Sequence, residues 1–229
     1  MPRHSRMATP GCYQKASMKT KERIGILGGT FNPVHMGHMI LAQDAVERLD
    51  LAKLLFVPCA TPPHKNCPDL ATTRHRVAMI EAAIEGDLRF ELCDLEVRRG
   101  GVSYAADTAR ELADLYPRAE LDFIIGSDTL PELHLWKNVS ELFRLCEFKV
   151  FERPGHLFQS LDKAKLELAS RWKEKLLANA MSCHLVDVSS SDIRYRVAEA
   201  LSMRYLVPPA VEMYICEHGL YSTSKGREH

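Results

Sequence analysis

Short apolar runs alternate with longer segments of helical periodicity along most of this chain. Apolar runs of strand length occur at 23–27, 54–57, 90–92, 121–125, 147–151 and 184–186. Helical patterns lie between and after them, at about 37–49, 72–85, 103–116, 160–178, 191–201 and 209–218. Alternation at this spacing is typical of right-handed βαβ units and a parallel sheet. We therefore predict an α/β fold, a doubly wound parallel sheet of Rossmann-like type with the C-terminal helices packed beside it.

Length and charge narrow the kinds of protein that this chain can be. Its 229 residues suffice for one large domain, which we expect over 23–222, between a disordered extension at 1–22 and a disordered tail at 223–229. The formal net charge is zero, so a general attraction to nucleic acid or to a membrane surface is not expected. The basic N-terminus lacks the apolar core of a secretory signal, and no run approaches the ~20 apolar residues of a membrane span. We expect a cytoplasmic protein, and the sequence carries no signal for an oligomeric state.

Seven cysteines are scattered along the chain without a CxxC pair. This pattern is typical of reduced, mostly buried thiols in a cytosolic protein. Cys59, His64 and Cys67 lie within nine residues, but a fourth ligand is missing nearby and the spacing matches no usual zinc motif. We therefore expect no metal ion held by protein side chains.

The loop after the first predicted strand carries groups that suit a phosphate. It reads GGTFNPVHMGH over 28–38 and connects the strand to a helix N-terminus. Gly28 and Gly29 let the backbone approach an anion, and the helix end offers free N–H groups and a positive dipole. His35 and His38 are three residues apart, so both rings can face one bound group. The loop is neither a Walker A sequence nor GxGxxG, which argues against a GTPase and a dehydrogenase.

Two further loops at the carboxyl ends of predicted strands also suit an anion. Pro62 and Pro63 stiffen the second loop, which limits the entropy lost when Lys65 meets an anion. The last loop reads VSSSDIR over 188–194, where a serine at the helix start can cap the helix and Arg194 follows one turn later. Hydroxyls, helix N–H groups and this guanidinium can form a cradle for a polyphosphate. Taken alone, each loop could equally be a solvated lysine or an ordinary helix cap.

Six segments together resemble one known family. They are GGTFNPVHMGH, VPCATPPHK, FIIGSDTL, ERPG, VSSSDIR and YICEHGLY, which occur in the family's order between about Arg23 and Tyr221. This combination is similar to the bacterial nicotinate-nucleotide adenylyltransferases, members of the HxGH nucleotidyltransferase superfamily. The resemblance implies an enzyme of NAD biosynthesis that transfers the adenylyl group of ATP to nicotinate mononucleotide, giving deamido-NAD and pyrophosphate.

The resemblance also implies roles for the residues that match the family's motifs. The catalytic residues would be His35, His38, Lys65 and Arg194. The ATP-binding residues would be Gly28, Gly29, Thr30, Phe31, Gly126, Asp128, Arg153, Ser189, Ser190 and Ser191. The mononucleotide would be bound by Asn32, Lys65, Ser103, Tyr104, Ala105, Trp136 and Lys137, with Trp136 stacked on the pyridine ring. Mg²⁺ would be coordinated by oxygens of ATP, so the sequence need not supply a complete set of protein ligands for it.

One departure from the family pattern bears on the acceptor. Ala105 and Ala109 stand where the family's SYTxxTL stretch has Thr and Leu, which concerns the choice between acid and amide nucleotides. Alternatives within the superfamily are nicotinamide mononucleotide or phosphopantetheine as acceptor. A non-catalytic ATP-binding module is a second alternative. The presence of both histidines, the lysine and the arginine argues against it. A tRNA-synthetase-like ligase is a third, but no KMSKS-like loop is present.

Overall fold

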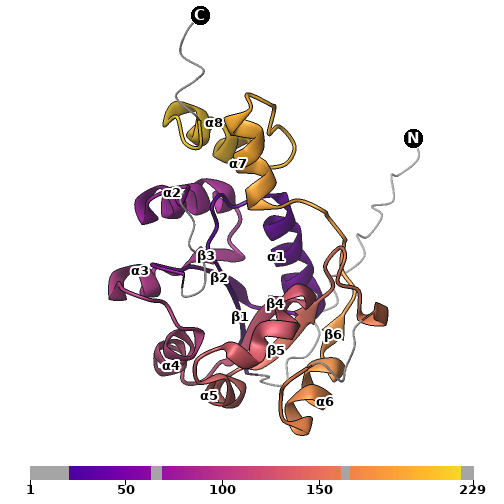
Figure 1. Ribbon diagram of the computed structural model, residues 1–229. Coiled ribbons are helices and arrows are strands. Elements are labelled where there is room, and N and C mark those ends of the chain that lie inside the picture. The colour runs from indigo at the N-terminus through magenta and orange to yellow at the C-terminus, as the bar shows by residue number, and fades with distance from the viewer. Residues whose placement is uncertain (1–20, 63–68, 161–165, 223–229) are drawn as a thin grey trace, which may run out of the picture.

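A computed structural model describes residues 21–62, 69–160 and 166–222. Its strands are β1 (Arg23–Gly29), β2 (Lys53–Pro58), β3 (Phe90–Leu92), β4 (Glu120–Gly126), β5 (Glu147–Phe151) and β6 (Ala180–Met181). Every strand pair is parallel, in the order β3-β2-β1-β4-β5-β6 (Figure 1). The order reverses between β1 and β4, which is the switch point of a doubly wound sheet. The predicted fold class is confirmed.

Helices cover both faces of this sheet. They are α1 (Met36–Leu49), α2 (Thr73–Ile84), α3 (Leu95–Arg99), α4 (Ala105–Leu115), α5 (Val139–Leu145), α6 (Ser170–Ala178), α7 (Ser190–Ala198) and α8 (Pro209–Glu217), with 3-10 turns η1 (Ser127–Leu135) and η2 (Phe158–Ser160). One buried cluster joins the sheet to α1, α2, α7 and α8, and a second joins its other face to α4, η1, α5 and α6. Figure 1 shows α7 and α8 together beside α2, at one end of the molecule.

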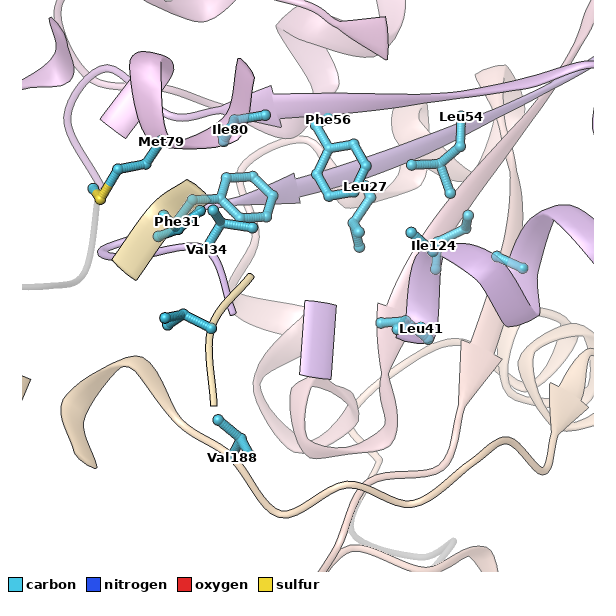
Figure 2. Packing of buried hydrophobic residues seen from close by; sticks show 14 of the residues in the cluster. Leu27, Phe31, Val34, Leu41, Leu54, Phe56, Met79, Ile80, Ile124 and Val188 are labelled. Atoms are coloured by element: carbon cyan, nitrogen blue, oxygen red, sulfur yellow. The ribbon is translucent and has the colours of Figure 1, made fainter. Parts of the chain in front are cut away.

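The loop after β1 is anchored in the first of these cores. Ile24 and Ile26 point to one face of β1 and Leu27 to the other, the alternation of a strand buried on both sides. Beyond the strand, Phe31 and Val34 also reach into the core, where the ring of Phe31 lies near that of Phe56 (Figure 2). Their exposed fractions are 1% and 0%. Two apolar anchors thus fix the loop that carries the histidines.

A charge pair between the partly buried Arg23 and the buried Asp122 joins the two central strands near the start of β1. The guanidinium of Arg23, at the start of β1, donates to both carboxylate oxygens of Asp122 on β4, at 3.0 and 2.9 Å. Burial raises the pKa of Asp122, and the hydrogen bonds from Arg23 oppose that shift. This pair ties the two central strands together far from the carboxyl ends of the strands.

The sixth strand lies elsewhere than the sequence predicts. The expected strand at 184–186 is wrong, because the chain pairs with β5 at Ala180 and Met181 instead. The backbone N–H and Nδ1 of His184 both bond the carboxylate of Asp44 on α1, at 2.8 Å each, and this draws the chain away from the sheet. Part of the helix expected at 160–178 lies outside the described residues, and α6 begins at Ser170.

Candidate active site

His35 and His38 meet at the first turn of α1. His35 is the N-cap residue, and its ring stacks on that of His38 with centroids 3.7 Å apart. The backbone N–H of His35 donates to Nδ1 of His38 at 3.3 Å. A neutral His38 therefore carries its proton on Nε2, where it can be donated to a ligand. The two histidines form the predicted pair, held in one orientation by the helix start.

Burial sets the protonation state of His35. His35 is only 2% exposed. Burial, and to a smaller extent the nearby charge of Arg153, lowers the pKa of its imidazole to about 3. Nδ1 of His35 has no hydrogen-bond partner among the described residues. A Cβ on Gly37 would lie 3.1 Å from this nitrogen, so glycine keeps the ring uncrowded. His35 is thus a neutral imidazole with one ring nitrogen available.

The N-terminus of α7 packs onto the same loop. Ser189 caps this helix by accepting from Asp192 N at 3.1 Å, as expected for a serine here. The hydroxyl of Ser190 donates to the Pro33 carbonyl at 2.8 Å, and Nη1 of Arg194 donates to the Asn32 carbonyl at 2.9 Å. Two helix N-termini, of α1 and α7, therefore meet beside the histidines, with Met36 N of α1 donating to Leu206 O and Asp192 N of α7 to Ser189 Oγ.

Arg194 is only partly engaged by the protein. Its Nη2 contacts Ser191 Oγ at 3.4 Å, while its Nε is buried without a partner among the described residues. A cavity of about 550 Å³ opens beside Arg194, between α7 and the residues that precede α2, with Tyr221 in its wall. A half-buried guanidinium of this kind can donate to further anionic oxygens.

The ends of β4 and β5 bring a third group of residues to this edge. A Cβ on Gly126 would lie 2.2 Å from the carboxylate of Asp128 and 2.8 Å from Arg153 Cγ, so a larger residue here would displace the two side chains that close over the strand end. Ser127, which the sequence analysis did not single out, accepts from Arg153 N at 2.9 Å and donates to His156 O at 2.6 Å. A narrow recess separates Arg153 from Gly37.

The predicted acceptor residues form a separate group near the N-terminus of α4. Nζ of Lys137 lies 4.0 Å from the ring centroid of Tyr104, the N-cap residue of α4, and Ala105 begins that helix. Trp136 is half-buried, with its ring edge-on to Phe123 at 5.9 Å. The structure thus brings together two segments that lie about thirty residues apart in the chain.

Other predicted residues have their side chains in use or outside the described ranges. Asn32 is 2% exposed: its Nδ2 donates to Asp69 O at 3.0 Å, and its Oδ1 accepts from Ala71 N at 3.1 Å and Tyr221 OH at 2.7 Å. Ser103 is also buried and accepts from the backbone of residue 60 at 2.9 Å. Lys65, His64 and Cys67 lie outside the described residues, whereas Cys59 is a buried free thiol.

Two residues that the sequence analysis missed connect these groups. Arg76, on α2, is fully buried and donates to the carbonyl of Thr30 in the loop after β1 at 2.9 Å. Tyr221 reaches Asn32 from the C-terminal end of the described chain. An arginine inside a helix and a tyrosine after the last helix give no sequence signal for such contacts. Within the described ranges, no helix is both long and apolar enough to cross a membrane.

Comparisons with known proteins agree with this geometry. The cytidylyltransferase-like family model matches residues 26–196. An Opitutus terrae protein named "probable nicotinate-nucleotide adenylyltransferase" is 44% identical over 203 residues, covering 89% of this chain and 100% of that protein. A Halalkalibacterium halodurans protein of the same name is 41% identical over 208 residues, covering 90% of this chain and 95% of that protein.

Solved structures share the fold at lower identity. Plasmodium falciparum nicotinic acid mononucleotide adenylyltransferase complexed with NaAD is 21% identical to this chain, with a TM-score of 0.68. The match covers 87% of this chain and 97% of that one. At this identity the likeness establishes the architecture of the sheet and its helices.

Proposed function

This chain belongs to the nicotinate-nucleotide adenylyltransferase family, and we therefore propose that it transfers the adenylyl group of ATP to nicotinate mononucleotide. The products are deamido-NAD and pyrophosphate, in a step of NAD biosynthesis. The observation that carries the proposal is the meeting of the histidine pair with the capped N-terminus of α7 and Arg194 on one loop. The relatives that share the name cover nearly all of the described chain at about 40% identity or more.

The proposed chemistry needs charge neutralisation rather than a base. A phosphate oxygen of the mononucleotide attacks the α-phosphorus of ATP, a new P–O bond forms, and the bond to the departing pyrophosphate breaks. The second pKa of a phosphate monoester is near ~6, so the nucleophile is already largely dianionic at neutral pH. Catalysis then rests on in-line alignment and on donors aimed at the developing charge.

Donors for the ATP phosphates come from the two helix N-termini. We propose that His38 Nε2 and the free ring nitrogen of neutral His35 contact the phosphate that is attacked, because both rings share one orientation. The backbone of Gly28 to Phe31 lies beside them at the end of β1. The hydroxyls of Ser189, Ser190 and Ser191, with Arg194, would hold the two phosphates that leave.

The adenosine would lie between the ends of β4 and β5 and the start of α1. The recess beside Gly37 and Arg153 has the position that this requires, next to the histidines. Gly126 and Asp128 lie next to Arg153, and the carboxylate of Asp128 is 3.9 Å from Arg153 Nε. We propose that Mg²⁺ arrives with ATP as part of the substrate, bound to phosphate oxygens.

The acceptor would bind near the N-terminus of α4. We propose that Trp136 stacks on the pyridine ring and that N–H groups at Ala105 and Lys137 hold its carboxylate. Lys65 would meet the mononucleotide phosphate. Ser103 and Asn32 contribute to this side by ordering the loops, because their side-chain bonds are already made within the protein. Nothing in this arrangement calls for nucleic acid or a membrane, and we propose the cytoplasm as its location.

Product analysis with purified protein tests the proposal. MgATP with nicotinate mononucleotide should release pyrophosphate and give the deamido dinucleotide. Pyrophosphate release with phosphopantetheine but not with the pyridine nucleotide would overturn the assignment, and no release with any acceptor would leave an ATP-binding module.

The same assay tests the pyridine pocket. Nicotinate mononucleotide should exceed nicotinamide mononucleotide in kcat/KM by at least about tenfold, since an amide N–H₂ would face donors. Trp136→Ala should reduce kcat/KM for both acceptors alike, because stacking depends little on the ring substituent. Equal use of both acceptors, or a Trp136→Ala effect confined to ATP, would show that the pocket lies elsewhere.

A further inference from the structure

Helix α3 carries a carboxylate that is buried against α4. Glu96 is 7% exposed, and its Oε1 accepts a hydrogen bond from the Thr108 hydroxyl at 2.6 Å. The hydroxyl of Ser103, just before α4, also bonds this carboxylate. Thr108 is itself buried, and its Oγ1 accepts from Nη2 of Arg99 at 3.0 Å. The carboxylate of Glu96 thus bonds hydroxyls on both sides of the residues that begin α4.

A carboxylate in this position is unfavourable for folding unless it is hydrogen-bonded and paired with a positive charge. Burial raises the pKa of Glu96, and the bonds from Thr108 and Ser103, followed by the charge of Arg99, oppose that shift. An apolar side chain could fill the same space but could not hold two hydroxyls. What the carboxylate supplies is therefore a fixed geometry between α3 and the start of α4.

The start of α4 is suited to an anion. Its N-cap residue, Tyr104, makes no side-chain cap, unlike Ser189 at the start of α7. The first-turn N–H groups of Ala105 and Ala106 have no acceptor among the described residues. The ammonium of Lys137, 4.0 Å from the ring centroid of Tyr104, adds a positive charge. These groups together favour a carboxylate of the ligand at this helix end.

We propose that Thr108 and Glu96 are positioning residues for the acceptor: their bond fixes the first turn of α4, so that the N–H groups of Ala105 and Ala106 meet the carboxylate on the pyridine ring. The inference rests on the proposed function for the identity of the acceptor. Among the described residues, the hydrogen-bond partners of the Thr108 hydroxyl all lie between residues 96 and 104, and none of them belongs to the proposed ATP site. A loss of this hydroxyl should therefore act on the acceptor.

The test compares wild type with Thr108→Val, which keeps the shape of the side chain and removes only the hydroxyl. For nicotinate mononucleotide, kcat/KM should fall by about tenfold, mainly through KM, because a small displacement of the N–H groups weakens charge-assisted bonds. For nicotinamide mononucleotide it should fall by less than about threefold, since a neutral amide makes weaker bonds to the same donors. KM for ATP should change by less than about twofold, because its site is separate. An unchanged acid-to-amide ratio, or an equal rise in both KM values, would overturn the inference.

Thr108→Ser tests for rescue, because serine restores the hydroxyl. Its acid-to-amide ratio should lie within about twofold of the wild-type ratio. If Thr108→Val yields no folded protein, Glu96→Gln takes its place. This variant exchanges one acceptor oxygen for a donor and should lower the ratio by at least about twofold. An unchanged ratio in Glu96→Gln would then decide against the inference.

Arg23→Gln is the matched control for a loss of stability alone. It also leaves a buried carboxylate without its donors, that of Asp122, but near the start of β1. This variant should lower the midpoint of thermal unfolding, as Thr108→Val does, and leave the acid-to-amide ratio unchanged. An equal fall of the ratio in Arg23→Gln would show that stability, and not positioning, is responsible.

NMR signals of the Ala105 and Ala106 amides give a readout that does not depend on turnover. Nicotinate mononucleotide should shift both signals in wild type, and nicotinamide mononucleotide should shift them less. In Thr108→Val the shift at the same concentration of nicotinate mononucleotide should be at least about threefold smaller. Wild-type protein that makes no dinucleotide would contradict the proposed function, whereas full shifts in Thr108→Val would contradict the positioning role by itself.

Discussion

His35 and His38 are three residues apart, yet their surroundings give them different properties. His35 is enclosed and neutral, and its pKa of about 3 leaves no positive charge on it at physiological pH. His38 receives a backbone N–H on Nδ1, which places the proton of its neutral form on Nε2. One ring is therefore enclosed within the protein, and the other carries the proton of its neutral form on Nε2.

Replacement of His38 tests that donor directly. His38→Ala should lower kcat by about 10²–10³, because a positioned donor to developing phosphate charge is worth a few kcal/mol. The unfolding midpoint and the KM for ATP should largely survive. His218→Ala, which removes the exposed C-cap histidine after α8, serves as control and should leave kcat unchanged. Steady-state kinetics at saturating substrates measure both, and a near-normal kcat in His38→Ala would remove His38 from the catalytic residues.

The buried imidazole of His35 also makes stability depend on pH. Its folded pKa of about 3 lies below the ordinary value of 6.5, so the unfolded chain takes up this proton first as the pH falls. The contribution to stability is therefore complete above about pH 6.5 and is lost progressively toward pH 3. His35→Asn lacks this titration. Urea unfolding of ligand-free protein between pH 7.5 and 4.5 should show a steeper acid loss for wild type than for the variant, and parallel curves would contradict the prediction.

The sequence predicts candidate site residues where they follow a local pattern. The histidine pair, the capping serine and Arg194 each occupy a fixed distance from a strand end or helix start, so their meeting could be expected. Arg76 and Ser127 could not be found in this way, because their partners are carbonyls of distant loops. A hydrogen bond to a backbone oxygen leaves no trace in the identity of the partner residue.

At the scale of elements, the approach of α7 to the loop after β1 completes the site. Ser190 and Arg194 bond the carbonyls of Pro33 and Asn32, so the helix and the loop share one arrangement. The segment after α8 adds to this assembly, since Tyr221 OH donates to Asn32 Oδ1. Burial raises the pKa of Tyr221, and the phenol therefore keeps its proton for this bond.

The bond from Tyr221 should matter for activity as well as stability. Tyr221→Phe leaves a buried acceptor on Asn32 with one donor fewer, at a cost of about 1–3 kcal/mol. Because Asn32 also holds Arg194, kcat/KM for ATP should fall by about tenfold. Tyr214→Phe is the matched control: its hydroxyl bonds His75 at 3.0 Å on the α2–α8 contact, away from the loop. Similar kinetic losses in the two variants would mean that C-terminal packing, and not this bond, is responsible.

Most strands were predicted, including the short β3 at Phe90–Leu92, but several short helical elements were not. The apolar runs of β1, β2, β4 and β5 and the pattern of α1 agree with the structure to within a few residues. Helix α3 has five residues and η1 contains Pro131, so neither shows a helical period long enough to detect. The last strand was misplaced because two short apolar stretches compete there, and contacts with α1 decide between them.

At the scale of the whole molecule, the doubly wound order gathers distant segments at one edge. The proposed ATP site draws on the ends of β1, β4 and β5 and on α7, which together span most of the described chain. The fold class, and the end of the strands where we propose the ATP site, follow from the βα alternation alone. Which side chains are free at that edge depends on long-range packing, as the fully bonded Asn32 shows.

A ligand that contacts so many elements should stabilise the entire fold. MgATP at about a hundred times its dissociation constant should add about 2.7 kcal/mol, which corresponds to an increase of roughly 5–10 °C in Tm for a chain of this size. Differential scanning fluorimetry measures the shift, with MgCTP at equal concentration as control. Arg194→Lys should show a smaller shift at the same MgATP concentration. A shift confined to excess Mg²⁺ without nucleotide would contradict the proposed ATP site.

The hydroxyl of Ser190 donates to the carbonyl of Pro33, a residue 157 positions earlier in the chain. A ribosome makes the chain from the N-terminus to the C-terminus. The glycine loop and both histidines therefore leave the exit tunnel long before α7 is made. Domains generally fold as units during synthesis, and here the unit lacks its polyphosphate cradle until the last helices emerge. A chain that ends ahead of Ser189 would therefore lack the proposed polyphosphate cradle, and we expect it to make no dinucleotide.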